Sequence, residues 1–173
     1  MGSKYFLILE TLIDASHAVH ENMRGNTGKC MKLGVGMIHA QSSKQLIDTK
    51  ISTVTEVVGV SEYVPFKIHM IHLLLGQVYS LKKKVLYQDN KSALRMKRNG
   101  RNSCTGNSRH INVRLFFVKD CIDKGEFTIE HCPMVLILAD YVTKALQGEF
   151  FQKMRRVIMG WDFIDSNPRY ITI

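Results

Sequence analysis

The chain has 173 residues, of which 45% are hydrophobic and 23% are charged. This length and apolar content are typical of one globular domain with a sizeable core, and they exclude an intrinsically disordered chain. No apolar run approaches the roughly 20 residues that a membrane-spanning helix needs, so we expect no membrane partner.

The first 50 residues predict a set of antiparallel strands. Residues 6–14 are largely apolar and predict a strand that ends at Asp14. Residues 30–40, with glycines at 34 and 36, predict one or two antiparallel strands, which a turn at Gly25–Gly28 joins to the first. Residues 42–50 predict a third, shorter strand. We therefore expect the sheet to begin with three antiparallel strands.

From Thr53 onward the apolar residues recur every three or four positions. This spacing predicts an amphipathic helix that ends near Gly76. Pro65 lies inside the apolar stripe, so we expect a kink or a break there. A short strand at 83–89 follows the helix, and residues 90–98 are then typical of another helix.

The second half of the chain predicts three more helices and one strand. A loop at 103–108 leads into a helix at 109–125, which its final glycine ends. Residues 126–132 predict a strand that a proline terminates, and residues 138–146 and 149–160 predict helices.

This order of elements is typical of a mixed sheet with helices on its faces. We therefore predict an α/β fold with a five-stranded mixed sheet, in a single domain over residues 1–173. Its core would cover about residues 6–147, and residues 148–173 would form a C-terminal helix and tail.

Basic residues are concentrated in the middle of the chain. The formal net charge is +9, and the segment from Asn90 to Lys119 contains eight Lys and Arg residues and no acid. A segment of one sign attracts a polyanion such as a nucleic acid, although a solvated basic face has the same composition. The eight residues are Lys91, Arg95, Lys97, Arg98, Arg101, Arg109, Arg114 and Lys119.

Four acids occupy similar positions relative to the predicted elements. Asp14 and Asp89 end strands, whereas Glu56 and Asp140 open helices. Strand ends and the helix starts beside them gather on one side of an open α/β sheet, and clustered carboxylates need divalent cations, for which Mg²⁺ or Mn²⁺ is suited. Two such ions, roughly 4 Å apart, would activate a water and stabilise the leaving oxygen of a phosphodiester.

Each acid also has a purely structural interpretation. Thr53 to Glu56 is a capping box, in which the carboxylate would bond only its own helix start. Asp89 and the following asparagine are a common turn-and-cap pair, and Asp140 near a helix N-terminus would favour the helix dipole. Spacing alone leaves the two interpretations open.

Seven blocks of the sequence bear on this choice: LIDASHA, MRGNTG, SSKQ, STVTEVVGVSEY, YQDNKSAL, SRHINVRLFFVKD and LADYVTKAL. Together, and in this order, they resemble the ribonuclease H domain of copia-type LTR retrotransposon polyproteins, which follows the reverse transcriptase domain. The resemblance runs from about residue 8 to residue 150. It implies a ribonuclease H-like fold and a partner reverse transcriptase domain in the same polyprotein.

The resemblance also implies roles for the four acids. Asp14 would bridge two metal ions, and Glu56 would hold one of them and orient the scissile region. Asp89 would complete the core of the site, and Asp140 would bind the second ion. The implied cofactor is a pair of Mg²⁺ or Mn²⁺ ions.

The implied reaction is endonucleolytic hydrolysis of the RNA strand of an RNA–DNA hybrid during retrotransposon reverse transcription. Such an enzyme must recognise the 2′-hydroxyl of the strand that it cuts. The candidate substrate contacts are Asn90, Ser92, Arg109 and His110. The expected location is a retroelement particle in the cytoplasm, with the nucleus as the alternative.

Several residues depart from the family's pattern. Asn112 replaces an aspartate, Ser16 stands where an acid is common, Pro65 interrupts a helix and Met134 replaces a threonine. These departures motivate a second hypothesis from another class of function. In it the chain is a catalytically silent retroelement remnant that binds nucleic acid through its basic face.

Overall fold

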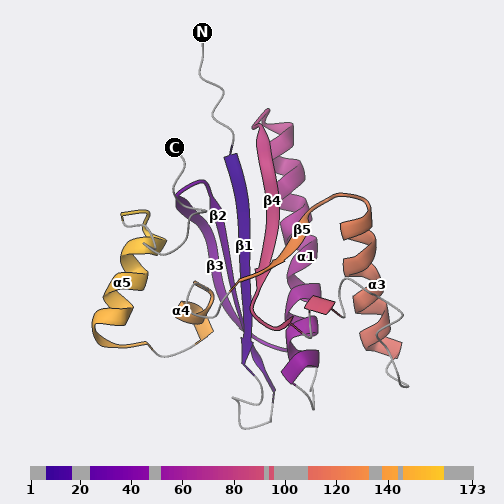
Figure 1. The fold of residues 1–173 in the computed structure, drawn as a ribbon, viewed down its shortest axis with the longest axis horizontal. Coiled ribbons are helices and arrows are strands. Elements are labelled where there is room, and N and C mark those ends of the chain that lie inside the picture. Colours follow the sequence, from indigo (N-terminus) through magenta and orange to yellow (C-terminus); the bar gives the residue numbers. More distant parts are fainter. Residues whose placement is uncertain are drawn as a thin grey trace.

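The computed structural model describes residues 7–16, 24–46, 52–91, 94–95, 109–132, 138–143 and 146–161, without the side chains of residues 109, 110 and 140. Its described strands form one mixed sheet in the order β3-β2-β1-β4-β5 (Figure 1). Strands β1, β2 and β3 pair antiparallel, whereas β4 and β5 run parallel to β1. The strands are β1 Leu7–Ser16, β2 Asn26–Leu33, β3 Gly36–Lys44, β4 Leu81–Gln88 and β5 Thr128–His131.

Helices cover both faces of this sheet. Figure 1 shows α1 and α3 on one side of the strands and α4 and α5 on the other. The predicted fold class is therefore confirmed: a mixed five-stranded sheet, antiparallel over its first three strands and flanked by helices. The helices are α1 Ser52–Gly76, α3 Arg109–Asp123, α4 Asp140–Thr143 and α5 Gly148–Ile158.

Each face of the sheet has its own apolar core. Alternate residues of a strand point to opposite faces, so Leu9 and Ile13 pack with Val64 of α1, whereas Leu12 packs with Met154 of α5. The helix face of α1 that is turned from the sheet joins α3 in a smaller cluster of Val57, Val58, Ile111 and Leu115. Strand β1, buried from both sides, is thus the fixed centre of the molecule. Within the described residues, no helix combines the length and apolarity needed to cross a membrane.

The prediction of the first turn was wrong. Asn26 to Gly28 belong to β2, and the reversal between β2 and β3 comes at Gly34, whose φ of 61° suits a residue without Cβ. The segment predicted as one or two strands at 30–40 is thus the end of one strand and the start of the next. The predicted third strand at 42–50 is the end of β3, which stops at Lys44; residues 47–50 lie outside the described part.

Of the kink or break predicted at Pro65, the break does not occur. Helix α1 runs without interruption from Ser52 to Gly76, with Pro65 inside it. The side chain of Pro65 is exposed, whereas the neighbouring Val64 is fully buried. The helix therefore loses one backbone hydrogen bond on its solvent side and keeps the apolar stripe that packs on the sheet.

The remaining elements follow the predicted order with shifted ends. Strand β4, helix α3 and strand β5 overlap the segments predicted at 83–89, 109–125 and 126–132. Gly125, with a φ of 71°, lies just beyond the end of α3, as expected. Lys91, Leu94 and Arg95 are helical, and Asn90 is not; the remaining residues of the predicted helix and the loop at 103–108 lie outside the described residues.

Candidate active site

Two of the predicted acids lie side by side because of the register of the sheet. Strand β1 pairs parallel with β4, and Leu12 lies opposite Tyr87. Asp14 and Asp89 each come two residues later, so the carboxyl ends of the two strands bring them to the same edge. Asp14 is 6% exposed and Asp89 is half-buried.

The third acid reaches this edge from helix α1. Glu56 lies in the first turns of α1 and is 4% exposed. Its Oε1 accepts a hydrogen bond from the backbone N–H of Ala15 at 3.2 Å, and its Oε2 accepts one from Gln88 Nε2 at 2.5 Å. Glu56 therefore does more than cap its own helix, because its carboxylate ties α1 to the ends of β1 and β4.

Asp14, Glu56 and Asp89 together form a compact cluster. One carboxylate oxygen from each lies within 4.8 Å of the others. Two of the three are buried, and within the part of the chain that the structure describes Asp14 forms no ion pair with a lysine or arginine. Oxygen ligands of this charge and spacing fit hard divalent cations such as Mg²⁺ or Mn²⁺, which would neutralise the cluster.

A hydroxyl group holds Asp14 from the other side. Thr143 Oγ1 of α4 donates to Asp14 Oδ2 at 2.7 Å. Helix α4 approaches so closely because Gly28 lies opposite Asp14 in β2. A Cβ on Gly28 would come within 2.5 Å of Thr143 Cγ2 and 2.6 Å of the Ala139 carbonyl oxygen.

Some of the other predicted site residues lie outside the part of the chain that the structure describes. Asp140 is the first residue of α4, the helix whose last residue bonds Asp14, but its side chain is not described. Asn90 follows Asp89 and is half-buried. Ser92 lies outside the described residues, and Arg109 and His110 begin α3 without described side chains.

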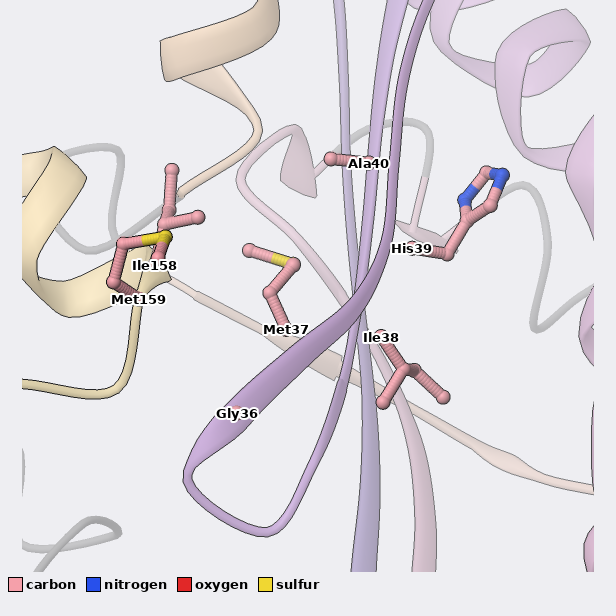
Figure 2. Close-up of a pocket in the computed structure, with 7 residues that line it drawn as sticks. All are labelled: Gly36, Met37, Ile38, His39, Ala40, Ile158 and Met159. Atoms are coloured by element: carbon pink, nitrogen blue, oxygen red, sulfur yellow. The ribbon is translucent and has the colours of Figure 1, made fainter.

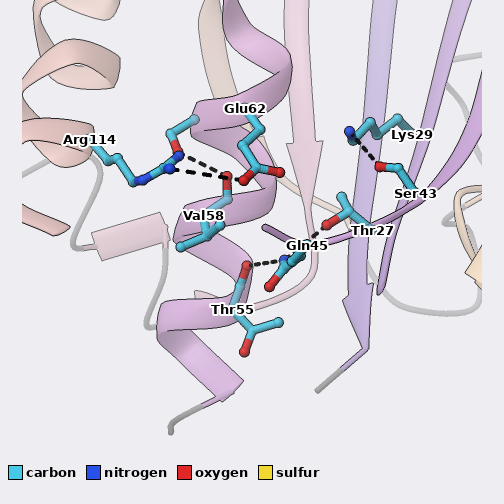
Figure 3. A network of polar contacts seen from close by, with 9 residues as sticks. Thr27, Lys29, Ser43, Gln45, Thr55, Val58, Glu62 and Arg114 are labelled. Carbon is cyan, nitrogen blue, oxygen red and sulfur yellow. Dashed lines mark hydrogen bonds and ion pairs between the residues drawn. The ribbon is translucent and has the colours of Figure 1, made fainter. Parts of the chain in front are cut away.

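Part of the basic segment pairs with acids within the fold. Arg114 Nη1 donates to Ser61 Oγ at 2.8 Å, and Arg114 Nη2 lies 3.9 Å from Glu62 Oε1 of α1 (Figure 3). Lys119 Nζ contacts Asp123 Oδ1 of the same helix at 2.5 Å. Arg114 therefore ties α3 to α1, and Lys119 pairs within α3. Lys91 and Arg95, two and six residues after Asp89, are exposed.

A second network fixes the start of α1 against the antiparallel strands. Gln45, which is fully buried, donates from Nε2 to Thr27 Oγ1 and to the Thr55 carbonyl oxygen, both at 2.9 Å (Figure 3). Gly59 of α1 packs on the same strand, and a Cβ there would lie 2.9 Å from Thr27 Cγ2. The helix that carries Glu56 is thus closely seated on β2.

A hollow of about 370 Å³ lies elsewhere, between edge strand β3 and the end of α5. Figure 2 shows Met37 pointing toward Ile158 and Met159, whereas His39 points to the other side of the strand. Burial and the nearby charge of Lys29 lower the pKa of His39. With an apolar lining and no acid, this hollow is not suited to metal-assisted hydrolysis.

Sequence reasoning did not single out Gln88 or Thr143, two side chains that donate to acids of the cluster. Both lie inside blocks that carried the resemblance, YQDNKSAL and LADYVTKAL. Their partners are 32 and 129 residues away in the chain, so no local pattern reveals the hydrogen bonds. The only available signal was their position, one residue before Asp89 and three after Asp140.

No protein-family model and no curated protein sequence matches the chain. Among solved structures, it is similar to ribonuclease H1 of Halobacterium salinarum, with 14% identity, a TM-score of 0.41, and coverage of 73% of this chain and 86% of that one. It is also similar to the N-terminal ribonuclease H domain of a Mycobacterium tuberculosis protein, with 11% identity, a TM-score of 0.47, and coverage of 87% and 97%. A third is the ribonuclease H domain of prototype foamy virus, with 11% identity, a TM-score of 0.45, and coverage of 75% and 80%. The similarities are low, so the fold assignment rests on the strand order and directions of this chain.

Proposed function

We propose that this chain is a metal-dependent ribonuclease that cuts the RNA strand of RNA–DNA hybrids. The observation that carries the proposal is the meeting of Asp14, Glu56 and Asp89 within 4.8 Å at the ends of two parallel strands. Carboxylates this close repel one another unless a cation lies between them. Two Mg²⁺ or Mn²⁺ ions would supply that charge, activate a water and stabilise the leaving oxygen of the phosphodiester.

The acids take the roles that the sequence blocks imply. Asp14 lies between the other elements of the site and would bridge the two ions. Glu56 would hold one ion and orient the scissile region, and Asp89 would complete the core. Asp140 would hold the second ion; its place is supported by the backbone of α4, whose last residue bonds Asp14.

The substrate would lie beside the cluster, over the exposed Lys91 and Arg95. Asn90, Ser92, Arg109 and His110 are the proposed substrate contacts. A contact to the 2′-hydroxyl is required, because this group distinguishes RNA from DNA locally. The biological setting we propose is reverse transcription of a copia-type retrotransposon, beside the reverse transcriptase domain and in a cytoplasmic particle or the nucleus. The order of the seven sequence blocks supports it.

The test is cleavage of a hybrid whose RNA strand is labelled. Wild-type protein with Mg²⁺ or Mn²⁺ should cut the RNA, and Asp89→Asn should not. Asp123→Asn is the matched control, because this acid is exposed and pairs only with Lys119 in the contacts of α3. It should cut as fast as wild type. Equal cleavage by wild type and Asp89→Asn would contradict the site assignment.

The second candidate function is a silent remnant that binds nucleic acid without cutting it. The exposed Lys91 and Arg95 and the departures at Ser16 and Asn112 favour it. It predicts binding of hybrid or duplex that weakens steeply with salt, because each neutralised phosphate releases counterions. It also predicts no cleavage with either metal. Cleavage that depends on Asp89 would contradict it.

A further inference from the structure

Neutral donors contact both buried carboxylates of the candidate site. Glu56 accepts from the backbone of Ala15 at 3.2 Å and from Gln88 at 2.5 Å. Asp14 accepts from Thr143 at 2.7 Å. Because a neutral donor orients a carboxylate without cancelling its charge, these contacts leave the negative charge of the cluster available to a cation.

The position of Gln88 favours its hydrogen bond to Glu56. It is the last residue of β4, it is fully buried, and Asp89 follows it directly. A buried amide that lost its acceptor would pay the cost of an unsatisfied donor, so the bond to Glu56 is hard to exchange for another. Gln88 thus links the orientation of Glu56 on α1 to the strand that carries Asp89.

Thr143 has two acceptors within reach of one proton. Its Oγ1 lies 2.7 Å from Asp14 Oδ2 and 3.3 Å from the Ala139 carbonyl oxygen. The shorter distance and the charge of the carboxylate favour donation to Asp14. The close approach of α4 at Gly28 keeps the hydroxyl in place, since no Cβ separates the helix from the strand.

We propose that Gln88 and Thr143 are positioning residues that hold Glu56 and Asp14 in the orientation in which they bind metal. This inference rests on the proposed function, because it concerns the same carboxylates. Donors behind metal ligands fix the direction of the ligand's free lone pairs, and their loss typically costs about 10- to 100-fold in metal affinity. Both carboxylates are still present in such variants, so cleavage should need a higher metal concentration and be retained once metal saturates the site.

The test measures Mn²⁺ affinity by calorimetry and the metal concentration that half-activates cleavage. Gln88→Met and Thr143→Val remove the donors at nearly constant volume. Each should weaken Mn²⁺ binding by about 10- to 100-fold and shift half-activation to higher Mn²⁺. Cleavage should recover when Mn²⁺ saturates the variants. Thr143→Ser, which keeps the hydroxyl, should restore affinity.

The matched control is Thr11→Val. Thr11 is fully buried, and its hydroxyl accepts a hydrogen bond from Lys67 Nζ at 2.8 Å instead of bonding an acid. It should keep wild-type Mn²⁺ affinity even if its melting temperature falls. Thr143 lies on a partly exposed helix, so the valine and serine pair remains informative if a buried glutamine variant does not fold.

Two results would overturn the inference while the proposed function stands. Wild-type Mn²⁺ affinity in folded Gln88→Met and Thr143→Val would show that the donors do not position the ligands. An equal loss in Thr11→Val would show that any buried polar substitution has the same effect. Wild-type protein that neither binds Mn²⁺ nor cuts the hybrid would overturn the proposed function, and the inference with it.

Discussion

Glu10 and Asp14 lie four residues apart on β1, on the same face of the sheet, and their exposures are 5% and 6%. Glu10 has a cation from the chain itself: Lys32 Nζ, on the paired residue of β2, lies 3.8 Å from its carboxylate. Asp14 is paired with Gly28 instead, receives one bond from a hydroxyl, and lies beside two further acids.

This difference distinguishes an acid with a cationic partner in the fold from an acid that the proposed function assigns to a metal ion. Burying a charge costs free energy unless a partner compensates it, and Lys32 compensates Glu10 within the fold. Among the described residues no lysine or arginine does this for Asp14. The proposed function assigns this role at Asp14 to a bound divalent cation.

The largest effect is expected from Asp14→Asn. Loss of a single electrostatic stabiliser in a buried active site costs about 10²- to 10³-fold in rate. Asp14 would hold both ions, so we expect a loss of more than about 10³-fold in kcat/KM for hybrid cleavage. Single-turnover cleavage at saturating Mn²⁺ measures it. A variant that retains a tenth of wild-type activity would break the distinction drawn between Asp14 and Glu10.

Substitutions at Glu10 and its partner Lys32 should change the stability of the protein instead of its activity. Lys32→Met leaves Glu10 buried without its cation and should lower the free energy of unfolding by about 3–5 kcal/mol. The double variant Glu10→Gln/Lys32→Met removes both charges and should recover most of this loss. Urea unfolding measures the three proteins. A single variant as stable as wild type would mean that Glu10 does not depend on Lys32.

Gly28→Ala tests how α4 reaches Asp14. The added Cβ would lie 2.5 Å from Thr143 Cγ2 and 2.6 Å from a backbone oxygen, so α4 must move. Overpacking of this kind costs about 1–3 kcal/mol in the free energy of unfolding. Gly36→Ala is the control, because a Cβ there meets nothing within 4 Å. Equal thermal unfolding of the two variants would show that Gly28 is not required for the approach.

Lys67 is a third buried ionisable residue, and it should make the stability of the protein depend on pH. Lys67 is fully buried and donates to Thr11 Oγ1 and the Val85 carbonyl, and burial lowers its pKa from 10.5 to about 7. Between pH 7 and 10.5 the unfolded chain therefore binds the proton that the folded chain has lost. The contribution of Lys67 to the free energy of unfolding should therefore rise with pH across that window by about 1.4 kcal/mol per pH unit. Below pH 7 it should not change with pH.

Lys67→Met should remove this part of the pH dependence of stability and leave the part that comes from the other titrating groups unchanged. Urea unfolding of both proteins from pH 6 to pH 9 gives the difference in slope, which isolates Lys67 from the other titrating groups. Parallel pH profiles for the two proteins would show that Lys67 keeps its proton in the fold.

Local pattern predicted most of the elements, because each depends on neighbours in sequence. The apolar stripe from Thr53 to Gly76 gave helix α1 its correct ends within one residue. The sequence pattern predicted the wrong local structure where tertiary packing decides the conformation. Gly28 resembles a turn residue, yet it lies in a strand because α4 needs the space above it. Pro65 resembles a helix breaker, yet its side chain faces solvent.

The candidate site was predictable in kind and not in detail. Asp14 and Asp89 could be grouped because parallel strands place their ends together, and Glu56 because a helix start lies beside those ends. The donors Gln88 and Thr143 could not be assigned, because their bonds join residues far apart in the chain. The contrast with Glu10 could not be predicted either, because its partner Lys32 lies opposite it only through the register of β1 on β2.

The most direct test of the account is thermal unfolding with increasing Mn²⁺. Metal that binds only the folded protein adds about 2.7 kcal/mol of stability at 100 times its dissociation constant. Mn²⁺ should therefore raise the melting temperature of wild type and of Glu10→Gln/Lys32→Met by similar amounts, and leave that of Asp14→Asn unchanged. An equal rise in all three proteins, or none in any, would contradict the claim that Asp14 takes its cation from solution.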